Sequence, residues 1–145
     1  MSEDFVPFNL AVKLKEKGFR EKCLCYYDTE DDDRNFLYWN AHEADIDYYF
    51  YHSWNTRCEG YNYIRFDAPT IFQVLKWLRE EKKIHFESVA AAYGYNVIIS
   101  QTPDKGGTDL YYTYMNYDGP NDGGAWDKYE DAVIYCIEYT LDNLI

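Results

Sequence analysis

The sequence contains no apolar run of the roughly 18–20 residues that a membrane-spanning helix requires. Its first residues, Met1 to Asp4, lack the basic and apolar segments of a signal peptide. Basic residues are scarce: 14 Lys and Arg stand against 26 Asp and Glu, which gives a formal net charge of −12. We therefore expect a cytoplasmic protein that docks neither on an anionic membrane face nor directly on nucleic acid.

Cysteine, proline and glycine are also few. The four cysteines are Cys23, Cys25, Cys58 and Cys136. They lack the close C-x2-C pairs of ordinary zinc sites, and a reducing cytosol favours free thiols. We therefore expect buried thiols, and no metal or other cofactor. With only 4 prolines and 8 glycines, no linker divides the chain, so residues 1–145 are expected to form a single globular domain.

Aromatic residues are abundant, with 17 Tyr, 8 Phe and 4 Trp, and this excludes global disorder. Apolar spacing predicts helices over about residues 9–17, 69–83 and 127–145. Asn9 is expected to cap the first helix and Gly18 to end it, whereas Asp127 and Glu130 have the spacing of a capping box at the start of the third.

The segments between these helices alternate as strands do. The expected strands cover about residues 23–28, 35–40, 47–52, 61–67, 85–92, 95–101 and 109–117. Short turns join most of them, and strands joined in that way pair antiparallel. The sequence therefore predicts an α+β fold of order α-ββββ-α-βββ-α, with an antiparallel sheet and three helices packed mainly on one face.

Tyrosines in the predicted strands are the most informative feature. Neighbours along a strand point to opposite faces, so helices covering one face leave a row of tyrosines on the other. One interpretation is β propensity combined with cross-strand aromatic pairing. The other is a recognition surface, since tyrosine offers a large contact area and a polar tip.

An acidic run on the first predicted hairpin has two interpretations as well: a solvated turn, or a carboxylate patch for a basic protein partner. We take the patch and its aromatic anchors as the candidate partner-binding site of a non-enzymatic protein. Its residues are Glu30, Asp31, Asp32, Asp33, Asp45, Asp47, Tyr49 and Tyr51.

Two alternatives remain open. A small-ligand or signalling-nucleotide binder would use aromatic walls beside cations such as Arg57, Arg65 or Lys105. A metal-dependent enzyme would use the cluster of His42, Glu43, Asp45 and Asp47. No serine lies in a G-x-S-x-G pattern and no cysteine has a recognisable histidine context, so no residue is assigned as catalytic and we favour a protein that is not an enzyme.

The second half of the chain resembles an uncharacterised family of small proteins from phages and mobile elements of gut bacteria. The resemblance lies in Ala68-Pro69-Thr70 and in residues 76–80, 129–137 and 140–145, which supply helix caps and core positions. No activity and no site residues carry over from that family. The resemblance implies a context of phage–host conflict, and hence an inhibitor of a host nucleic-acid-binding or defence protein as the expected function.

Overall fold

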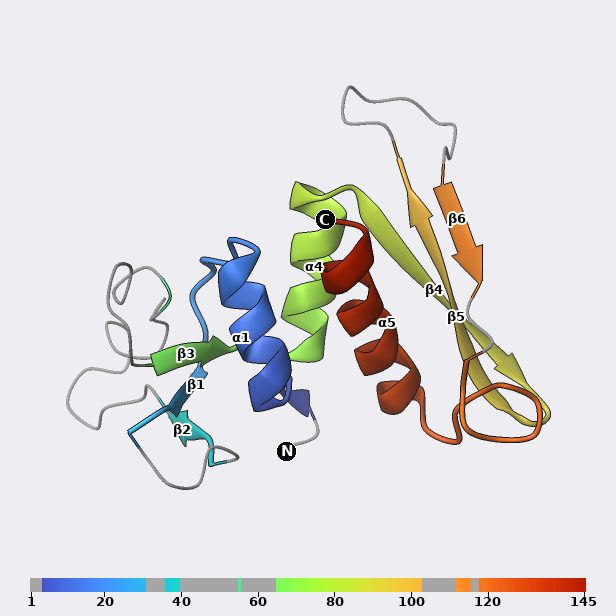
Figure 1. Cartoon of the computed structure of the whole chain (residues 1–145), viewed down its shortest axis with the longest axis horizontal. Coiled ribbons are helices and arrows are strands. Elements are labelled where there is room, and N and C mark those ends of the chain that lie inside the picture. Colours follow the sequence, from blue (N-terminus) through green and yellow to red (C-terminus); the bar gives the residue numbers. More distant parts are fainter. Residues whose placement is uncertain (1–3, 31–35, 40–54, 56–64, 103–111, 116–117) are drawn as a thin grey trace. The chain divides into compact units, whose positions relative to one another are not determined.

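The computed structural model describes residues 4–30, 36–39, 55, 65–102, 112–115 and 118–145 (Figure 1). Its elements are α1 (Phe8–Glu16), β1 (Cys25–Asp28), β2 (Tyr38–Trp39), β3 (Arg65–Ala68), α4 (Ile71–Glu81), β4 (Ile84–Ala91), β5 (Gly94–Gln101), β6 (Tyr112–Met115) and α5 (Tyr129–Asn143). All pairs between these strands are antiparallel, which confirms the α+β class.

The described strands form two three-stranded sheets, β2-β1-β3 and β4-β5-β6, where the sequence predicted one. The chain groups into two compact units, residues 1–72 and 73–145, and each is described by itself. The predicted strand at 47–52 lies outside the described residues, so the full order of elements stays a prediction. No helix in the described part of the chain is both long and apolar enough to cross a bilayer.

Helix α1 begins after Pro7, whose carbonyl accepts hydrogen bonds from the amides of Leu10 and Ala11. The prediction that Asn9 caps it is wrong: Asn9 lies within the helix, and no side chain caps the helix start. The end is as predicted. Gly18 has a φ of +93°, and the amide that follows it donates to the Leu14 carbonyl at 2.9 Å. This left-handed glycine closes the helix and brings the chain back toward the core.

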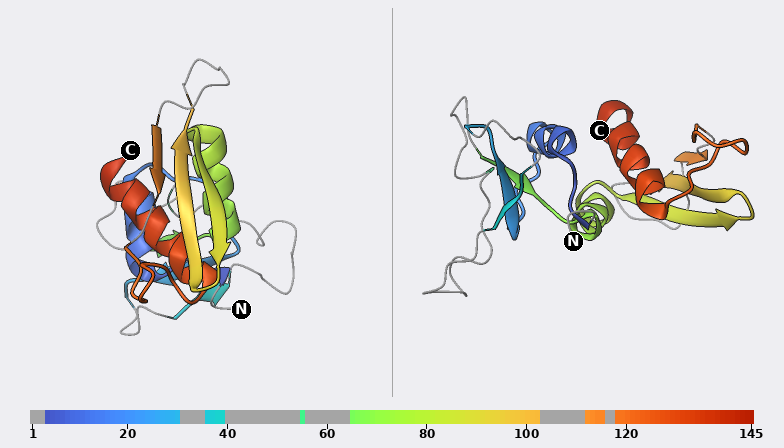
Figure 2. Two further views of the ribbon diagram at one scale, coloured as in Figure 1. Left: turned by 90° about the vertical axis from the view of Figure 1, so that its right-hand side faces the viewer. Right: turned by 90° about the horizontal axis from the view of Figure 1, so that it is seen from below.

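The first sheet has β1 at its centre, paired with β2 as the predicted hairpin requires and with β3 on its other side. Cys25 and Tyr27 are buried on one face of β1. Helix α1 lies against that face (Figure 2). Its Phe8 ring meets the rings of Tyr27 and Phe66 edge to face at 5.6 and 5.7 Å. Tyr26 and Asp28 point to the opposite face and are half-buried.

The second sheet rests against α5. Strands β4 and β5 pair without interruption from Ile84↔Gln101 to Ala91↔Gly94. Helix α5 packs on β5, and Tyr129 meets Tyr95 edge to face at 6.2 Å (Figure 2). The buried residues of α5 recur at the helical spacing that predicted this helix: Ala132, Val133, Cys136, Ile137, Thr140 and Leu141.

The chain before α5 folds around Asn121. Its side-chain oxygen accepts from the amides of Gly123 and Ala125, and its amide group donates to the Tyr93 carbonyl at 2.6 Å. The same amide group donates to Asp127 at 3.3 Å. The predicted capping box is therefore wrong: α5 has no side-chain cap, and the Asp127 carboxylate faces the loop instead.

Two glycines with positive φ give a stability prediction. Gly94 has a φ of +139°, and a Cβ on it would lie 2.5 Å from the Trp126 carbonyl oxygen, whereas Gly18 has no atom within 4 Å of that position. Gly18→Ala should cost about 1 kcal/mol of unfolding free energy through backbone strain alone. Gly94→Ala should cost about 3 kcal/mol or more, since steric overlap adds to strain. Urea unfolding of both variants measures the difference, and equal losses would contradict it.

Candidate functional site

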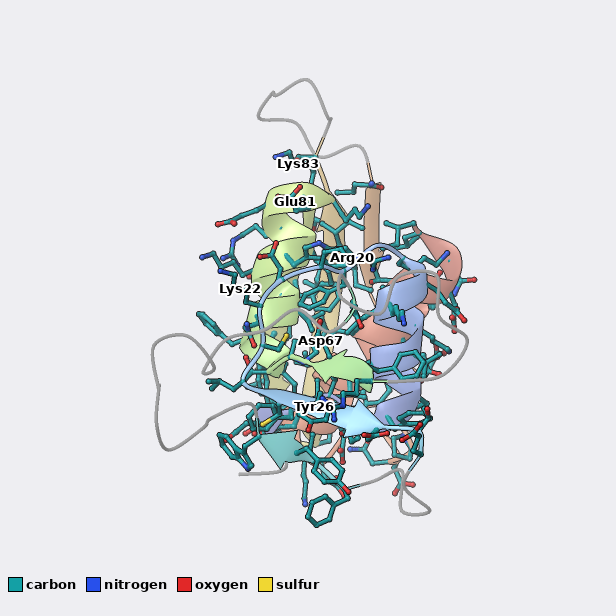
Figure 3. The ribbon with its side chains drawn as sticks, turned by 90° about the vertical axis from the view of Figure 1, so that its left-hand side faces the viewer. Arg20, Lys22, Tyr26, Asp67, Glu81 and Lys83 are labelled. Atoms are coloured by element: carbon teal, nitrogen blue, oxygen red, sulfur yellow. The ribbon has the colours of Figure 1, made fainter. Side chains whose placement is uncertain are left out.

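The face of the first sheet opposite α1 carries Tyr26 of β1, which is labelled in Figure 3, together with planar side chains from β2 and β3. The Arg65 guanidinium carbon lies 4.8 Å from the centre of the Tyr26 ring. Tyr26 stacks on Tyr38 at 5.5 Å with 18° between the ring planes, and Tyr38 contacts Phe36 at 4.8 Å. We call these four residues the aromatic stack.

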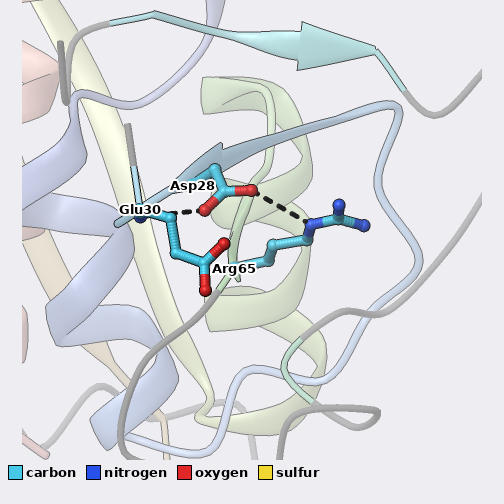
Figure 4. Close-up of polar contacts among 3 residues, drawn as sticks. All are labelled: Asp28, Glu30 and Arg65. Carbon is cyan, nitrogen blue, oxygen red and sulfur yellow. Dashed lines mark hydrogen bonds and ion pairs between the residues drawn. The ribbon is translucent and has the colours of Figure 1, made fainter. Parts of the chain in front are cut away.

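Asp28 joins the aromatic stack to the acidic run. One carboxylate oxygen accepts the Glu30 amide at 2.9 Å, and the other lies 3.3 Å from Nε of Arg65 (Figure 4). The first contact is an Asx turn, which ends β1 and directs the chain into the acidic run. The second holds Arg65 over Tyr26. With side chains 36% and 20% exposed, this ion pair orders Arg65 more than it stabilises the fold.

The aromatic stack exposes a large apolar surface, because its Phe36 is 53% exposed. Trp39 is 47% exposed, but it pairs with Cys25 and so points to the other face of the sheet, where it meets Phe5 edge to face at 5.9 Å. Strand β2 is an edge of its sheet among the described strands. Exposed aromatic side chains held by neighbouring rings are preorganised for contact, because little side-chain entropy remains to be lost on binding.

Buried polar contacts lie on the same face of the sheet, beside the aromatic stack. Asp67 pairs with Tyr26 across the sheet and is fully buried. Its carboxylate accepts the Asn55 amide at 3.0 Å, and its own amide donates to the Asn55 side chain at 3.1 Å. Asn55 also donates to the Phe19 carbonyl at 2.9 Å. These bonds tie β3 to two distant parts of the chain and fix the strand that carries Arg65.

The two thiols described in this unit, Cys23 and Cys25, are structural. Burial, aided by the charge of Asp67, raises the pKa of Cys23 far above its ordinary range, and burial raises the pKa of Cys25 to about 11. Both therefore stay protonated at neutral pH, when a metal ligand or a nucleophile would need the thiolate. The prediction of buried free thiols is confirmed for Cys23, Cys25 and Cys136, while Cys58 lies outside the described residues.

Most of the predicted site residues lie outside the described part of the chain. Glu30 is described: it is exposed in the turn after β1. Those outside are Asp31, Asp32, Asp33, Asp45, Asp47, Tyr49 and Tyr51. Their assignment stays a prediction, although the first three directly follow Glu30 in the sequence.

Only some residues of the two alternative sites, for a small ligand and for a metal ion, lie in the described part of the chain. Arg65 lies beside Tyr26, as a ligand-binding wall would require, whereas Arg57 and Lys105 are outside the described residues. The proposed metal ligands His42, Glu43, Asp45 and Asp47 are outside as well. Among the described residues, no three His, Cys, Asp or Glu side chains are grouped so as to hold a metal ion.

The sequence analysis did not single out Phe36 and Tyr38, which the structure brings together in the aromatic stack. Tyr49 and Tyr51, which it chose as anchors, lie outside the described residues and stay a prediction. A signal was present: residues 23–28 and 35–40 read as one hairpin with an aromatic pair on each strand. Cross-strand pairing of those aromatics follows from such a hairpin once its register is known.

Comparison with known proteins identifies no relative: no family model, no curated protein and no solved structure matches this chain. The resemblance to a phage-associated family accordingly stays a prediction.

Tyr27 gives a pH prediction. Burial, with a smaller contribution from Cys25, raises the pKa of Tyr27 to about 12 from an ordinary value of 10.0, and the hydroxyl donates to the Val6 carbonyl at 2.6 Å. The neutral phenol therefore stabilises the fold fully below about pH 10, and this stabilisation is lost as the pH rises through about 12.

Tyr27→Phe should cost about 1 kcal/mol at neutral pH and should make the alkaline loss of stability shallower. Urea unfolding across that pH range tests this. Parallel curves for the wild type and the variant would contradict it, because all the other tyrosines are common to both proteins.

Proposed function

We propose that this chain is a non-enzymatic, cytoplasmic binding protein that uses the aromatic stack and the acidic turn beside it to hold a protein with a basic surface. The observation that carries the proposal is the continuity of the two features: Asp28 contacts both Arg65 of the stack and the amide of Glu30 in the turn. Aromatic anchors beside carboxylates suit a partner that presents cations around an apolar centre.

Charge supports the choice of partner class. The chain carries a net charge of −12, and the residues that follow Glu30 are three further aspartates. Proteins that bind nucleic acids expose Lys and Arg arranged for phosphates, and a carboxylate series can occupy the same groups. Together with the resemblance to phage proteins, this favours a host nucleic-acid-binding or defence protein as the target of inhibition.

The test is capture of a partner from host lysate by the immobilised protein, followed by affinity measurement with the purified partner. Phe36→Ala should weaken binding about tenfold or more, since exposed aromatic anchors dominate interfaces. Phe72→Ala is the matched control, because Phe72 is 76% exposed at the start of α4 and outside the site. Retention of a partner with equal affinity by Phe36→Ala would contradict the proposed surface.

A second pair of variants tests the contribution of the acidic turn to binding. Glu30→Lys should slow association, and Glu80→Lys, which changes the net charge equally at an exposed position of α4, should do so much less. Raising the salt from about 0.1 to 1 M shortens the screening length from roughly 10 to 3 Å and should weaken wild-type binding. A partner whose binding is indifferent to salt and to Glu30→Lys would refute the electrostatic component.

A small-ligand or signalling-nucleotide binder is the second candidate, favoured by the guanidinium of Arg65 over the Tyr26 ring. We rank it lower because Asp28 offsets the positive charge that an anionic ligand needs. Thermal-shift screening with nucleotides and sugars tests it. A ligand at about 100 times its dissociation constant adds about 2.7 kcal/mol of stability. Arg65→Ala should abolish that gain, and a flat response to every compound would count against this candidate.

A further inference from the structure

The aromatic stack ends at an exposed ring. The strand order places Tyr26 of β1 between Tyr38 of β2 and Arg65 of β3, and both contact its ring, with centres 5.5 and 4.8 Å away. Phe36 lies 4.8 Å from Tyr38 and is 53% exposed. One end of the stack is therefore a cation, whereas the other end is a ring with about half of its surface open to solvent.

Carboxylates lie near the exposed end. Asp28 shares a face of β1 with Tyr26 and lies two residues nearer the segment that joins β1 to β2. Phe36 likewise lies two residues nearer that segment than Tyr38. The exposed Glu30 follows in the turn beside Asp28 (Figure 4). Nearby carboxylates and the negative face of an aromatic ring both attract a cation, so this end of the stack suits a positively charged group.

Rings of this chain hold cations elsewhere in the same way. Arg65 lies over Tyr26, and Nζ of Lys15 lies 4.8 Å from the centre of the Phe66 ring. Within the aromatic stack the cation is an arginine. Its guanidinium is planar, stacks on aromatic faces and is more weakly hydrated than an ammonium group. An arginine therefore gives up less hydration than a lysine when it covers an exposed ring.

We propose that Phe36 takes an arginine side chain of the partner, whose guanidinium stacks on the exposed ring and is attracted by the Glu30 carboxylate. This inference rests on the proposed function and narrows it, because the basic surface is then recognised through arginine and not through positive charge alone. The bound side chain extends the aromatic stack by one planar group. Contact with Tyr38 already restricts Phe36, so little side-chain entropy is lost on binding.

Two peptides of equal length and equal charge test the preference, one with arginine and the other with lysine at every basic position. Fluorescence anisotropy of each labelled peptide, titrated with the full chain at low salt, gives the two dissociation constants. The arginine peptide should bind about two- to fivefold more tightly, because a guanidinium adds stacking on the ring that an ammonium group cannot make. Equal affinities would overturn the arginine preference and leave the proposed basic partner in place. Binding of neither peptide would overturn both proposals.

Variants of Phe36 locate the contact. Phe36→Leu keeps an apolar side chain but removes the ring, so it should bring the two dissociation constants together, mainly by weakening the arginine peptide. Phe36→Trp offers a larger ring and should keep or increase the preference. Phe72→Leu is the matched control, because it removes a ring that is 76% exposed on α4, and it should leave the ratio unchanged. An arginine preference that persists in Phe36→Leu, or that is lost in Phe36→Trp, would overturn the assignment to Phe36.

Discussion

Neighbouring residues of a strand point to opposite faces of the sheet, and a single helix can cover only one of them. In β1 this constraint decides the character of the first unit. Cys25 and Tyr27 form core with α1, so Tyr26 and Asp28 must lie on the other face. The aromatic stack is thus a consequence of core formation. The packing that buries Tyr27 against α1 leaves Tyr26 on the opposite face of the sheet.

The helices were predictable because their apolar spacing is a property of the local sequence. Leu10 and Leu14 of α1, like Ile137 and Leu141 of α5, are fully buried as that spacing requires. The capping residues at the helix starts were not predictable, because other groups compete for the hydrogen bonds of a capping side chain. Asp127 could have capped α5, but Asn121 lies within reach of its carboxylate, and a loop closed by Asn121 decides the outcome.

The sequence predicts the type of residues in the candidate site, but not which of them lie together on one face. Tyrosines in strands and an acidic hairpin turn are visible in the sequence, and Glu30 lies where the turn was expected. Which tyrosines are exposed depends on register and on the position of α1, which follow from contacts distant in sequence. Asp67 illustrates the limit: it reads as an ordinary acid at the end of a strand, and only the distant Asn55 explains its burial.

The proposed surface is acidic, and its charge decides how partner binding responds to salt. The acidic turn attracts cations over a screening length, so its association with a basic protein weakens as salt is added. Two copies of a chain with a net charge of −12 repel each other, and added salt reduces that repulsion. The same change in ionic strength therefore weakens partner capture while it also weakens the repulsion between copies of the chain.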